Sequence, residues 1–386
     1  MGNTRKIGLL SVYNHNYGSI LQAYAMQRIL MDMGLDVEII RYKKTNMFKQ
    51  ALRLFNIPLL KATIRMKYKD MYCKLCKKEI HQKILKTREL AFSEFVSTHI
   101  RFSKIYAGRM ALKNGCNKYD TFVLGSDQVW NPMNLGSDFF TMTFIPDDKP
   151  KITYASSFGV SVIPIYQKNK TKAYLKRINY ISVREISGQK IVKELTGRDI
   201  PVVVDPTILL SRDVWDAEKG EPIVKEKYIM CYFISSNPLH RDFARRLAYK
   251  TGCKIVSVPH VDEYVKEDVG FGDIVPKGVG PLQFVNLISN ADYVCTDSFH
   301  GTVFSILYNK TFFTFNRYSG NGKDSTNSRL HSILKLIGLE SRMFDSEMEI
   351  YEELLTTINY EKSHKQLERL RTESINYLNN AIYGQR

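Results

Sequence analysis

The stretch LISNADYVCTDSFHGTVFSILYNKTFFTF, residues 287–315, reads as a short helix, a buried strand, a polar turn, a second helix and another strand. The strand of residues 291–296 ends in the turn Asp-Ser-Phe-His-Gly of residues 297–301, where the next helix begins. Polar side chains that follow a strand in this way lie at the edge where open α/β sheets bind ligands. The stretch therefore predicts an α/β fold and a candidate site at the turn.

The turn combines groups that suit an anion and a proton transfer. The free N–H groups and the dipole at the start of the following helix attract negative charge beside Ser298 and Gly301. His300 is the strongest candidate for a proton-transfer residue, because imidazole changes its charge near neutral pH. Asp297 is a candidate base. A simpler explanation stays open, in which Asp297 and Ser298 only cap the helix and His300 only packs.

The N-terminal half repeats the pattern of a buried strand followed by polar residues. Residues 6–13 read as a strand, residues 14–19 as an Asn-rich loop and residues 20–33 as a helix. The loop lacks the three-glycine fingerprint of dinucleotide folds, which argues against nicotinamide or flavin binding. The loop residues that we expect to face a cleft are Asn14, Asn16, Tyr17 and Gly18. An ordinary helix-capping loop would contain the same residues.

Further strands end in polar residues later in this half. Residues 119–124 and 152–158 read as buried strands, and residues 181–185 place Arg184 at the end of another. The guanidinium fork of an arginine binds both oxygens of a carboxylate or phosphate, although Arg184 could instead pair with Glu185. The residues expected to face the cleft after the first of these strands are Ser126, Asp127, Gln128 and Trp130.

Alternating strands and helices in both halves predict an α/β architecture of two doubly wound, Rossmann-like domains that face each other across a cleft. A chain of 386 residues has room for two domains. We expect an N-terminal domain over residues 1–210, a linker over 211–225, a C-terminal domain over 226–345, and helices over 346–386 that pack back. The sequence has no run of 18 apolar residues, so no transmembrane helix is expected.

A basic helical insertion is expected at about residues 45–95. Residues 41–90 contain 15 Lys and Arg against 3 Asp and Glu, a net charge of +12 out of +17 for the chain. The insertion could lie on an anionic membrane surface, or pack one face on the domain and expose the other. A nucleic-acid partner is not expected, because the segment has no recognised nucleic-acid motif. Cys73 and Cys76 lack the second ligand pair that zinc requires, so we expect reduced thiols in a cytosolic protein.

Six short motifs follow one another in the chain: NYGS at 16–19, GSDQVWN at 125–131, SVRE at 182–185, DP at 205–206, TDSFHG at 296–301 and SR at 328–329. Together they resemble the polysaccharide pyruvyl transferase family. The resemblance implies a GT-B-like fold and transfer of the pyruvyl unit of phosphoenolpyruvate onto two sugar hydroxyls as a ketal. Many members carry Arg-Leu-His-Gly where this chain has Ser-Phe-His-Gly, so another cation must replace that arginine.

The resemblance also implies roles for the candidate residues. Arg184, Arg329 and the helix start after His300 would bind phosphoenolpyruvate, with His300 as acid and Asp127 or Asp297 as base. The acceptor would be a sugar on a polyprenyl pyrophosphate carrier at the inner face of the membrane, where a cytoplasmic, peripheral enzyme would meet it. Phosphoenolpyruvate would be a co-substrate, and no metal or other cofactor is expected. A nucleotide-sugar glycosyltransferase with the same fold is the alternative, because fold does not determine function.

Overall fold

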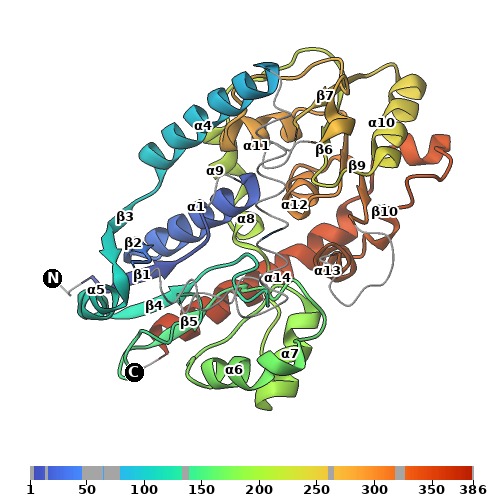
Figure 1. Cartoon of the computed structure of the whole chain (residues 1–386). Helices are drawn as coiled ribbons and strands as arrows, with labels where there is room; N and C mark the ends of the chain where they lie inside the picture. Colours follow the sequence, from blue (N-terminus) through green and yellow to red (C-terminus); the bar gives the residue numbers. More distant parts are fainter. Residues whose placement is uncertain are drawn as a thin grey trace.

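The structure is a computed structural model that describes residues 4–13, 16–45, 64, 79–132, 139–259, 265–317 and 327–384. Within these residues the chain forms two parallel five-stranded sheets, each flanked by helices (Figure 1). Strands that are buried on both faces need nearly continuous apolar sequence, and the central strands of both sheets have it. The α/β fold with two Rossmann-like, GT-B-like domains is confirmed.

The N-terminal sheet has the strand order β3-β2-β1-β4-β5. Its strands are β1 (Lys6–Leu10), β2 (Asp36–Lys43), β3 (Phe102–Ala107), β4 (Thr121–Leu124) and β5 (Lys151–Thr153). The edge strand β3 was not predicted, because its burial alternates irregularly and gives a weak pattern. The strand predicted at residues 181–185 forms only isolated bridges, which join Val183 to Ser156 and to Val202.

The C-terminal sheet has the order β10-β9-β8-β6-β7 and contains the stretch 287–315 at its centre. Its strands are β6 (Tyr228–Tyr232), β7 (Lys254–Ser257), β8 (Tyr293–Thr296), β9 (Thr311–Phe315) and β10 (Met343–Phe344). Its helices are α10 (Pro238–Thr251), α11 (Pro281–Ser289), α12 (Phe299–Leu307) and α13 (Ser328–Ile337). The strand, polar turn, helix and strand predicted for this stretch are therefore confirmed.

The remaining helices surround the two sheets. They are α1 (Tyr17–Asp32), α4 (Glu79–His99), α5 (Gly108–Gly115), α6 (Ile165–Lys176), α7 (Ile186–Thr196), α8 (Pro206–Leu209), α9 (Arg212–Glu218) and α14 (Glu361–Tyr383). Short 3₁₀ helices cover Cys116–Lys118, Lys266–Asp268, Glu340–Arg342 and Glu352–Leu355. We expected a polar linker at residues 211–225, but α9 lies there because Trp215 is fully buried against Tyr24 and Phe304.

Most of the basic insertion lies outside the described residues, including Cys73 and Cys76. Its described part is α4, which packs Phe92 and Phe95 into the core beside Tyr17 and Tyr24. Among the described helices, none combines the length and apolar character needed to cross a bilayer. Contact of the insertion with lipid stays a prediction from its charge.

The last helix, α14, lies along the N-terminal domain although it follows the C-terminal one (Figure 1). The Ser374 hydroxyl accepts a hydrogen bond from the Val204 N–H at 3.1 Å, and the Tyr377 hydroxyl donates one to the Thr153 carbonyl at 2.8 Å. The first bond holds α14 next to the segment that ends at residue 205, and the second holds it next to β5. The chain therefore crosses between the domains twice.

Tyr17, the first residue of α1, joins the two domains. Its ring stacks on Phe284 of α11 with 4.5 Å between centroids and 8° between planes. Its hydroxyl donates a hydrogen bond to the Val279 carbonyl at 2.8 Å, and only 1% of the residue is exposed. We predicted Tyr17 as a cleft residue, but the structure buries it in the contact between domains, since its aromatic body needs apolar surroundings.

Tyr17→Ala should lower the free energy of unfolding by about 3 kcal/mol, because removal of a buried aromatic ring leaves a cavity. Tyr17→Phe should lower it by about 1 kcal/mol, because only the hydrogen bond is lost. Urea unfolding followed by circular dichroism measures both, with Tyr249→Ala at a 92% exposed tyrosine as the control. Equal unfolding midpoints for the Tyr17→Ala and Tyr249→Ala variants would contradict the docking role.

Candidate functional site

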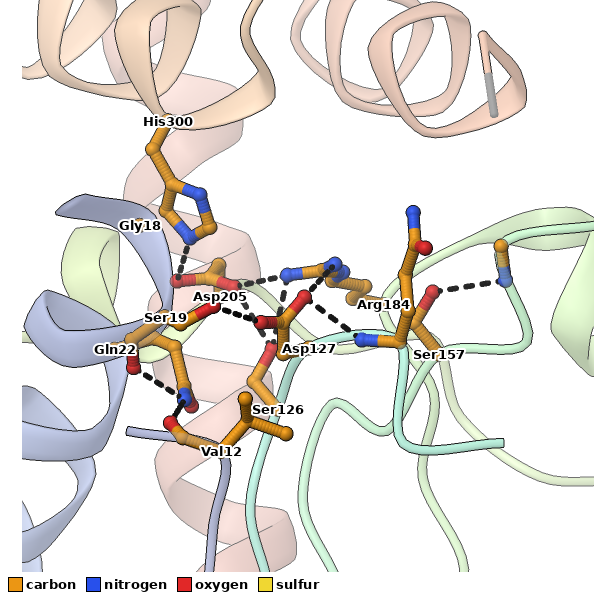
Figure 2. Close-up of polar contacts among 12 residues, drawn as sticks. Val12, Gly18, Ser19, Gln22, Ser126, Asp127, Ser157, Arg184, Asp205 and His300 are labelled. Atoms are coloured by element: carbon orange, nitrogen blue, oxygen red, sulfur yellow. Dashed lines mark hydrogen bonds and ion pairs between the residues drawn. The ribbon is translucent and has the colours of Figure 1, made fainter. Parts of the chain in front are cut away.

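His300 and Asp205 meet where the two domains touch (Figure 2). His300 comes from the first turn of α12, and Asp205 precedes α8. The His300 Nε2 lies 3.7 Å from the Asp205 Oδ1, and both side chains are buried. Ser298 caps α12, because its hydroxyl accepts a hydrogen bond from the Gly301 N–H at 3.3 Å. The cap holds the turn that carries His300 against the opposite domain.

Gly18 lies against the His300 ring on the N-terminal side. A Cβ atom at position 18 would lie 1.9 Å from the His300 Nδ1, so no other residue fits there without displacing the ring. Asn16 caps α1, because its Oδ1 accepts a hydrogen bond from the Gly18 N–H at 3.0 Å. Asn14 lies outside the described residues. The Asn-rich loop thus caps a helix, as the simpler explanation held, and also brings that helix to His300.

Arg184 connects the carboxylates beneath His300. Its Nη1 donates hydrogen bonds to the Asp205 Oδ2 at 2.8 Å and to the Ser126 Oγ at 3.2 Å. Its Nη2 lies 3.5 Å from the Asp127 Oδ1, and its Nε lies 3.8 Å from the Glu185 Oε2. Burial alone would lower the pKa of Arg184, but the three carboxylates outweigh burial and raise it. The guanidinium charge is therefore compensated inside the protein.

Asp205 is a site residue that our sequence analysis quoted in the Asp-Pro motif but to which it gave no role. Its Oδ2 accepts a hydrogen bond from the Ser126 hydroxyl at 2.8 Å in addition to that from Arg184. Burial would raise its pKa, but His300 and Arg184 outweigh burial and hold that pKa well below its ordinary value. The available signal was the Asp-Pro pair that follows a short apolar run, which places an acid at a strand end.

Asp127 lies on the other side of Arg184 in a strained backbone conformation. Its φ is +80°, a value that residues other than glycine rarely adopt. Its Oδ2 accepts a hydrogen bond from the Ser19 hydroxyl at 2.6 Å. Burial would raise the pKa of Asp127, but Arg184, His300 and Ser19 lower it overall. The lowered pKa keeps this carboxylate ionised at neutral pH. The side chain is 16% exposed, so it reaches the surface of the site.

Arg329 belongs to the same cluster and comes from the start of α13. With the Gln128 amide oxygen turned toward it, Arg329 donates a hydrogen bond of 2.6 Å from Nη2 to that oxygen. The Phe299 ring lies 4.6 Å from the Arg184 guanidinium carbon and 5.7 Å from that of Arg329. Burial, together with the charges of Arg184 and Arg317, lowers the pKa of Arg329 to about 9. His300, Arg184 and Arg329 are therefore brought together from both domains.

Three candidates have other surroundings. Both carboxylate oxygens of Asp297 accept hydrogen bonds from backbone N–H groups, of Ile234 at 2.7 Å and of Ser235 at 2.9 Å. Trp130 is fully buried and donates its indole N–H to the Phe140 carbonyl, so it belongs to the core and not to the site. A Cβ atom at Gly301 would lie 2.5 Å from a side-chain oxygen of the preceding strand, which makes its smallness a packing requirement.

The chain matches the model of one protein family, and it is similar to several solved structures at low sequence identity. A family model described as polysaccharide pyruvyl transferase matches residues 16–319. No curated protein matches the chain. Among solved structures, the chain is similar to a putative UDP-N-acetylglucosamine 2-epimerase from Listeria monocytogenes, with 9% identity, a TM-score of 0.49, and coverage of 100% of this chain and 98% of that one. It is also similar to MurG of Acinetobacter baumannii, with 9% identity, a TM-score of 0.43 and 95% coverage of both chains.

Gly18→Ala should lower the free energy of unfolding by about 1–3 kcal/mol, because the new methyl group overlaps the His300 ring. In a His300→Ala background the same change should be neutral or stabilising by up to about 1 kcal/mol, since alanine favours a helix over glycine. Urea unfolding of the four proteins gives the coupling energy between the two positions. Additive effects would show that Gly18 and His300 are not in contact.

Acid should destabilise the protein through its buried carboxylates. The pKa of Asp297 is lowered in the folded state, because His240, Arg317 and the two N–H groups outweigh the effect of burial. A lowered folded pKa stabilises the protein above the unfolded value of about 3.9, and this stabilisation is lost as the pH falls further. The free energy of unfolding should therefore drop between about pH 5 and pH 3.

The Asp297→Asn variant removes one of these titrating groups and should show a smaller drop over the same interval. Asp199→Asn, at a carboxylate with an 86% exposed side chain, serves as the control. The measurement is urea unfolding at a series of pH values. If the free energy of unfolding of the Asp297→Asn variant fell with pH as steeply as that of the wild type, Asp297 would not be one of the carboxylates with a lowered pKa.

Proposed function

The chain belongs to the polysaccharide pyruvyl transferase family and is a transferase, and from that premise we propose that it moves the pyruvyl group of phosphoenolpyruvate to a sugar of a surface or capsular polysaccharide precursor. The product is a ketal on two sugar hydroxyls. The observation that carries the proposal is the buried imidazole of His300, which lies beside Asp205 in a cluster with two arginines drawn from both domains.

The reaction begins with a proton on the methylene carbon of phosphoenolpyruvate, supplied by His300 as general acid. The central carbon then has positive character, and a sugar hydroxyl attacks it and loses its proton. The C–O bond to phosphate breaks, phosphate leaves, and a second hydroxyl closes the ketal ring and loses its own proton. The His300 Nε2 makes no hydrogen bond among the described residues, but it lies 3.7 Å from the Asp205 Oδ1, so this carboxylate is the group that the ring nitrogen faces.

Asp205 is a positioning residue in this mechanism. Its carboxylate is charged at neutral pH, because His300 and Arg184 hold its pKa well below the ordinary value in spite of burial. It accepts hydrogen bonds from Ser126 and Arg184, so its own orientation is rigid. The fixed carboxylate lies 3.7 Å from the His300 Nε2 and so holds the imidazole in one orientation for the first step.

Asp127 is the better candidate for the carboxylate that receives the acceptor hydroxyl. Both carboxylates accept hydrogen bonds on each oxygen, Asp297 from two backbone N–H groups and Asp127 from the Gln128 N–H and the Ser19 hydroxyl. Asp297 is fully buried, whereas the Asp127 side chain is 16% exposed and lies beside Arg184. A carboxylate with a lowered pKa is a weak base, so Asp127 first orients the hydroxyl and takes its proton as the new C–O bond forms. The acceptor would approach from the N-terminal domain, carried on a polyprenyl pyrophosphate.

His300→Ala should reduce turnover by about 10²–10⁴-fold, the usual effect of a positioned acid. The assay is phosphate release from phosphoenolpyruvate with a panel of lipid-linked or model galactosides and N-acetylhexosamines. Asp205→Asn should also lose activity, whereas His364→Ala, at an exposed histidine on α14, should retain it. Thermal shift against nucleotide sugars tests the glycosyltransferase alternative. If the His300→Ala variant transferred the pyruvyl group at a rate near that of the wild type, the proposed mechanism would be wrong.

A further inference from the structure

The start of helix α6 exposes a group of large apolar side chains. Val162, in the loop before the helix, is 45% exposed, and the first two helical residues, Ile165 and Tyr166, are 86% and 61% exposed. Within the part of the chain that the structure describes, no other run of five residues contains three exposed large apolar side chains. Exposed apolar groups are ordinary when they occur singly, but a cluster rimmed by polar residues marks a surface that another molecule covers.

The rest of α6 is strongly basic. This helix of 12 residues contains four lysines and no Asp or Glu. Lys172 and Lys176 lie on the same stripe of the helix as Ile165, because they follow it by about two and three helical turns. Both lysines are exposed, and neither forms an ion pair with a residue that the structure describes. The apolar start of α6 therefore continues into a positively charged face.

The opposite face of α6 determines how this surface points. Thr171, Tyr174 and Leu175 are buried, and the centroid of the Tyr174 ring lies 6.0 Å from that of Trp130 in the core. The helix packs beside α7 at the lower end of the N-terminal domain (Figure 1). Because its inner face is close-packed, the exposed residues cannot turn inward without breaking this packing. The fold itself thus holds the exposed stripe toward the solvent.

The chemistry of this surface suits an anionic lipid bilayer better than other partners. Apolar side chains that enter the headgroup region, with lysines beside them on the lipid phosphates, are typical of helices at a membrane surface. A second copy of the chain would place the same lysines opposite one another across a two-fold axis, where like charges repel. A nucleic acid would bind chiefly through its phosphates and leave the apolar cluster in water.

We propose that the α6 surface, formed by Val162, Ile165, Tyr166, Lys172 and Lys176, binds an anionic lipid bilayer. The apolar side chains lie at the level of the headgroups, and the lysines extend their charges to the lipid phosphates. The α6 surface is separate in sequence from the basic insertion, and it belongs to a helix whose packing the structure describes. Its exposure and charge carry the proposal, whichever reaction the protein catalyses.

Only a short length of chain separates the α6 surface from the candidate site. Gly159 packs against Gln128, since a Cβ atom at position 159 would lie 2.8 Å from the Gln128 Cδ. Gln128 in turn accepts a hydrogen bond from Arg329 of the cluster. An extended chain spans at most about 3.6 Å per residue, so Ile165 lies within about 22 Å of Gly159. A bilayer on the α6 surface would bring a lipid-linked acceptor to the N-terminal side of the site, a consequence that rests on the function proposed above.

The test measures flotation of the full-length chain at low salt with vesicles of phosphatidylcholine, alone or mixed with phosphatidylglycerol. The wild type should bind the anionic vesicles more tightly than the neutral ones. Lys172→Gln/Lys176→Gln should lower the partition coefficient about thirtyfold, because each basic residue near an anionic membrane contributes about 1 kcal/mol, or about fivefold. Lys362→Gln/Lys365→Gln, which removes the same charge from two exposed positions on α14, should bind like the wild type.

Ile165→Ser tests the apolar part of the α6 surface. It should lower the partition coefficient about tenfold, because an isoleucine side chain that leaves water is stabilised by about 1.5–3 kcal/mol. Val269→Ser, at a 56% exposed aliphatic residue of the C-terminal domain, is the matched control and should bind like the wild type.

Tyr166→Trp reports directly whether the surface enters the bilayer. The two tryptophans of the chain, Trp130 and Trp215, are fully buried, so an indole at position 166 is the one that meets lipid. Its emission should shift to the blue on anionic vesicles and be quenched by brominated lipids. Circular dichroism confirms that each variant is folded.

Two results would overturn the proposal. The first is failure of the wild type to bind anionic vesicles at low salt, or equal binding by the wild type and the Lys172→Gln/Lys176→Gln variant. The second is loss of binding in the lysine variant while Ile165→Ser binds fully and the emission of Tyr166→Trp does not shift. The surface would then bind anions without entering a bilayer, as it would with an acidic protein or a nucleic acid.

A turnover measurement separates this proposal from the proposed function. In the phosphate-release assay with a water-soluble acceptor, Lys172→Gln/Lys176→Gln should turn over like the wild type, and its KM should rise only for a lipid-linked acceptor in anionic vesicles. If turnover is normal but vesicle binding is unchanged in this variant, the α6 surface is wrong and the function stands. If no acceptor supports turnover yet the variant loses vesicle binding, the function is wrong and the membrane surface stands.

Discussion

The buried contact among Arg184, Asp205 and His300 requires both domains at once. Arg184 and Asp205 belong to the N-terminal domain and His300 to the C-terminal one, and all three are buried. A buried ion pair adds little net stability, but removing one partner leaves an uncompensated charge. Separation of the domains would therefore strip Asp205 of one of the two groups that lower its pKa. The contact couples domain docking to the electrostatics of the site.

Close approach is the second requirement of this arrangement. The His300 ring fits only because position 18 lacks a side chain, and Asp127 holds its carboxylate near Arg184 only by adopting a left-handed backbone. Strain of this kind persists where the surrounding structure determines the conformation. Tyr17 directly precedes Gly18 in the chain. Its ring stacks on Phe284 and so holds the start of α1 against the C-terminal domain. The docking contact and the site thus depend on the same helix turn.

The arginines of the site divide by the charges around them. Arg184 has three carboxylates within 4 Å, so it organises the N-terminal side of the site and has little charge left for a ligand. Arg329 donates a hydrogen bond to the Gln128 amide, and Arg317 donates one to the Asp297 backbone carbonyl. We had assigned donor binding to Arg184 and Arg329 together. The contacts favour Arg184 as a positioning residue for Asp205, and donor binding by Arg329 stays a prediction.

Strand ends and helix starts could be predicted from the sequence, because apolar runs followed by polar turns depend only on local order along the chain. That pattern was enough for the α/β class, for β8 and α12, and for His300 as a candidate. It could not separate Trp130 and Asp297, which face the interior, from Asp127, because all three follow strands of the same kind. The contact of Asp205 with His300 and the fit of Gly18 against the His300 ring were decided by tertiary structure alone. Each depends on which atoms from distant parts of the chain meet when the two domains dock, and no local pattern records that.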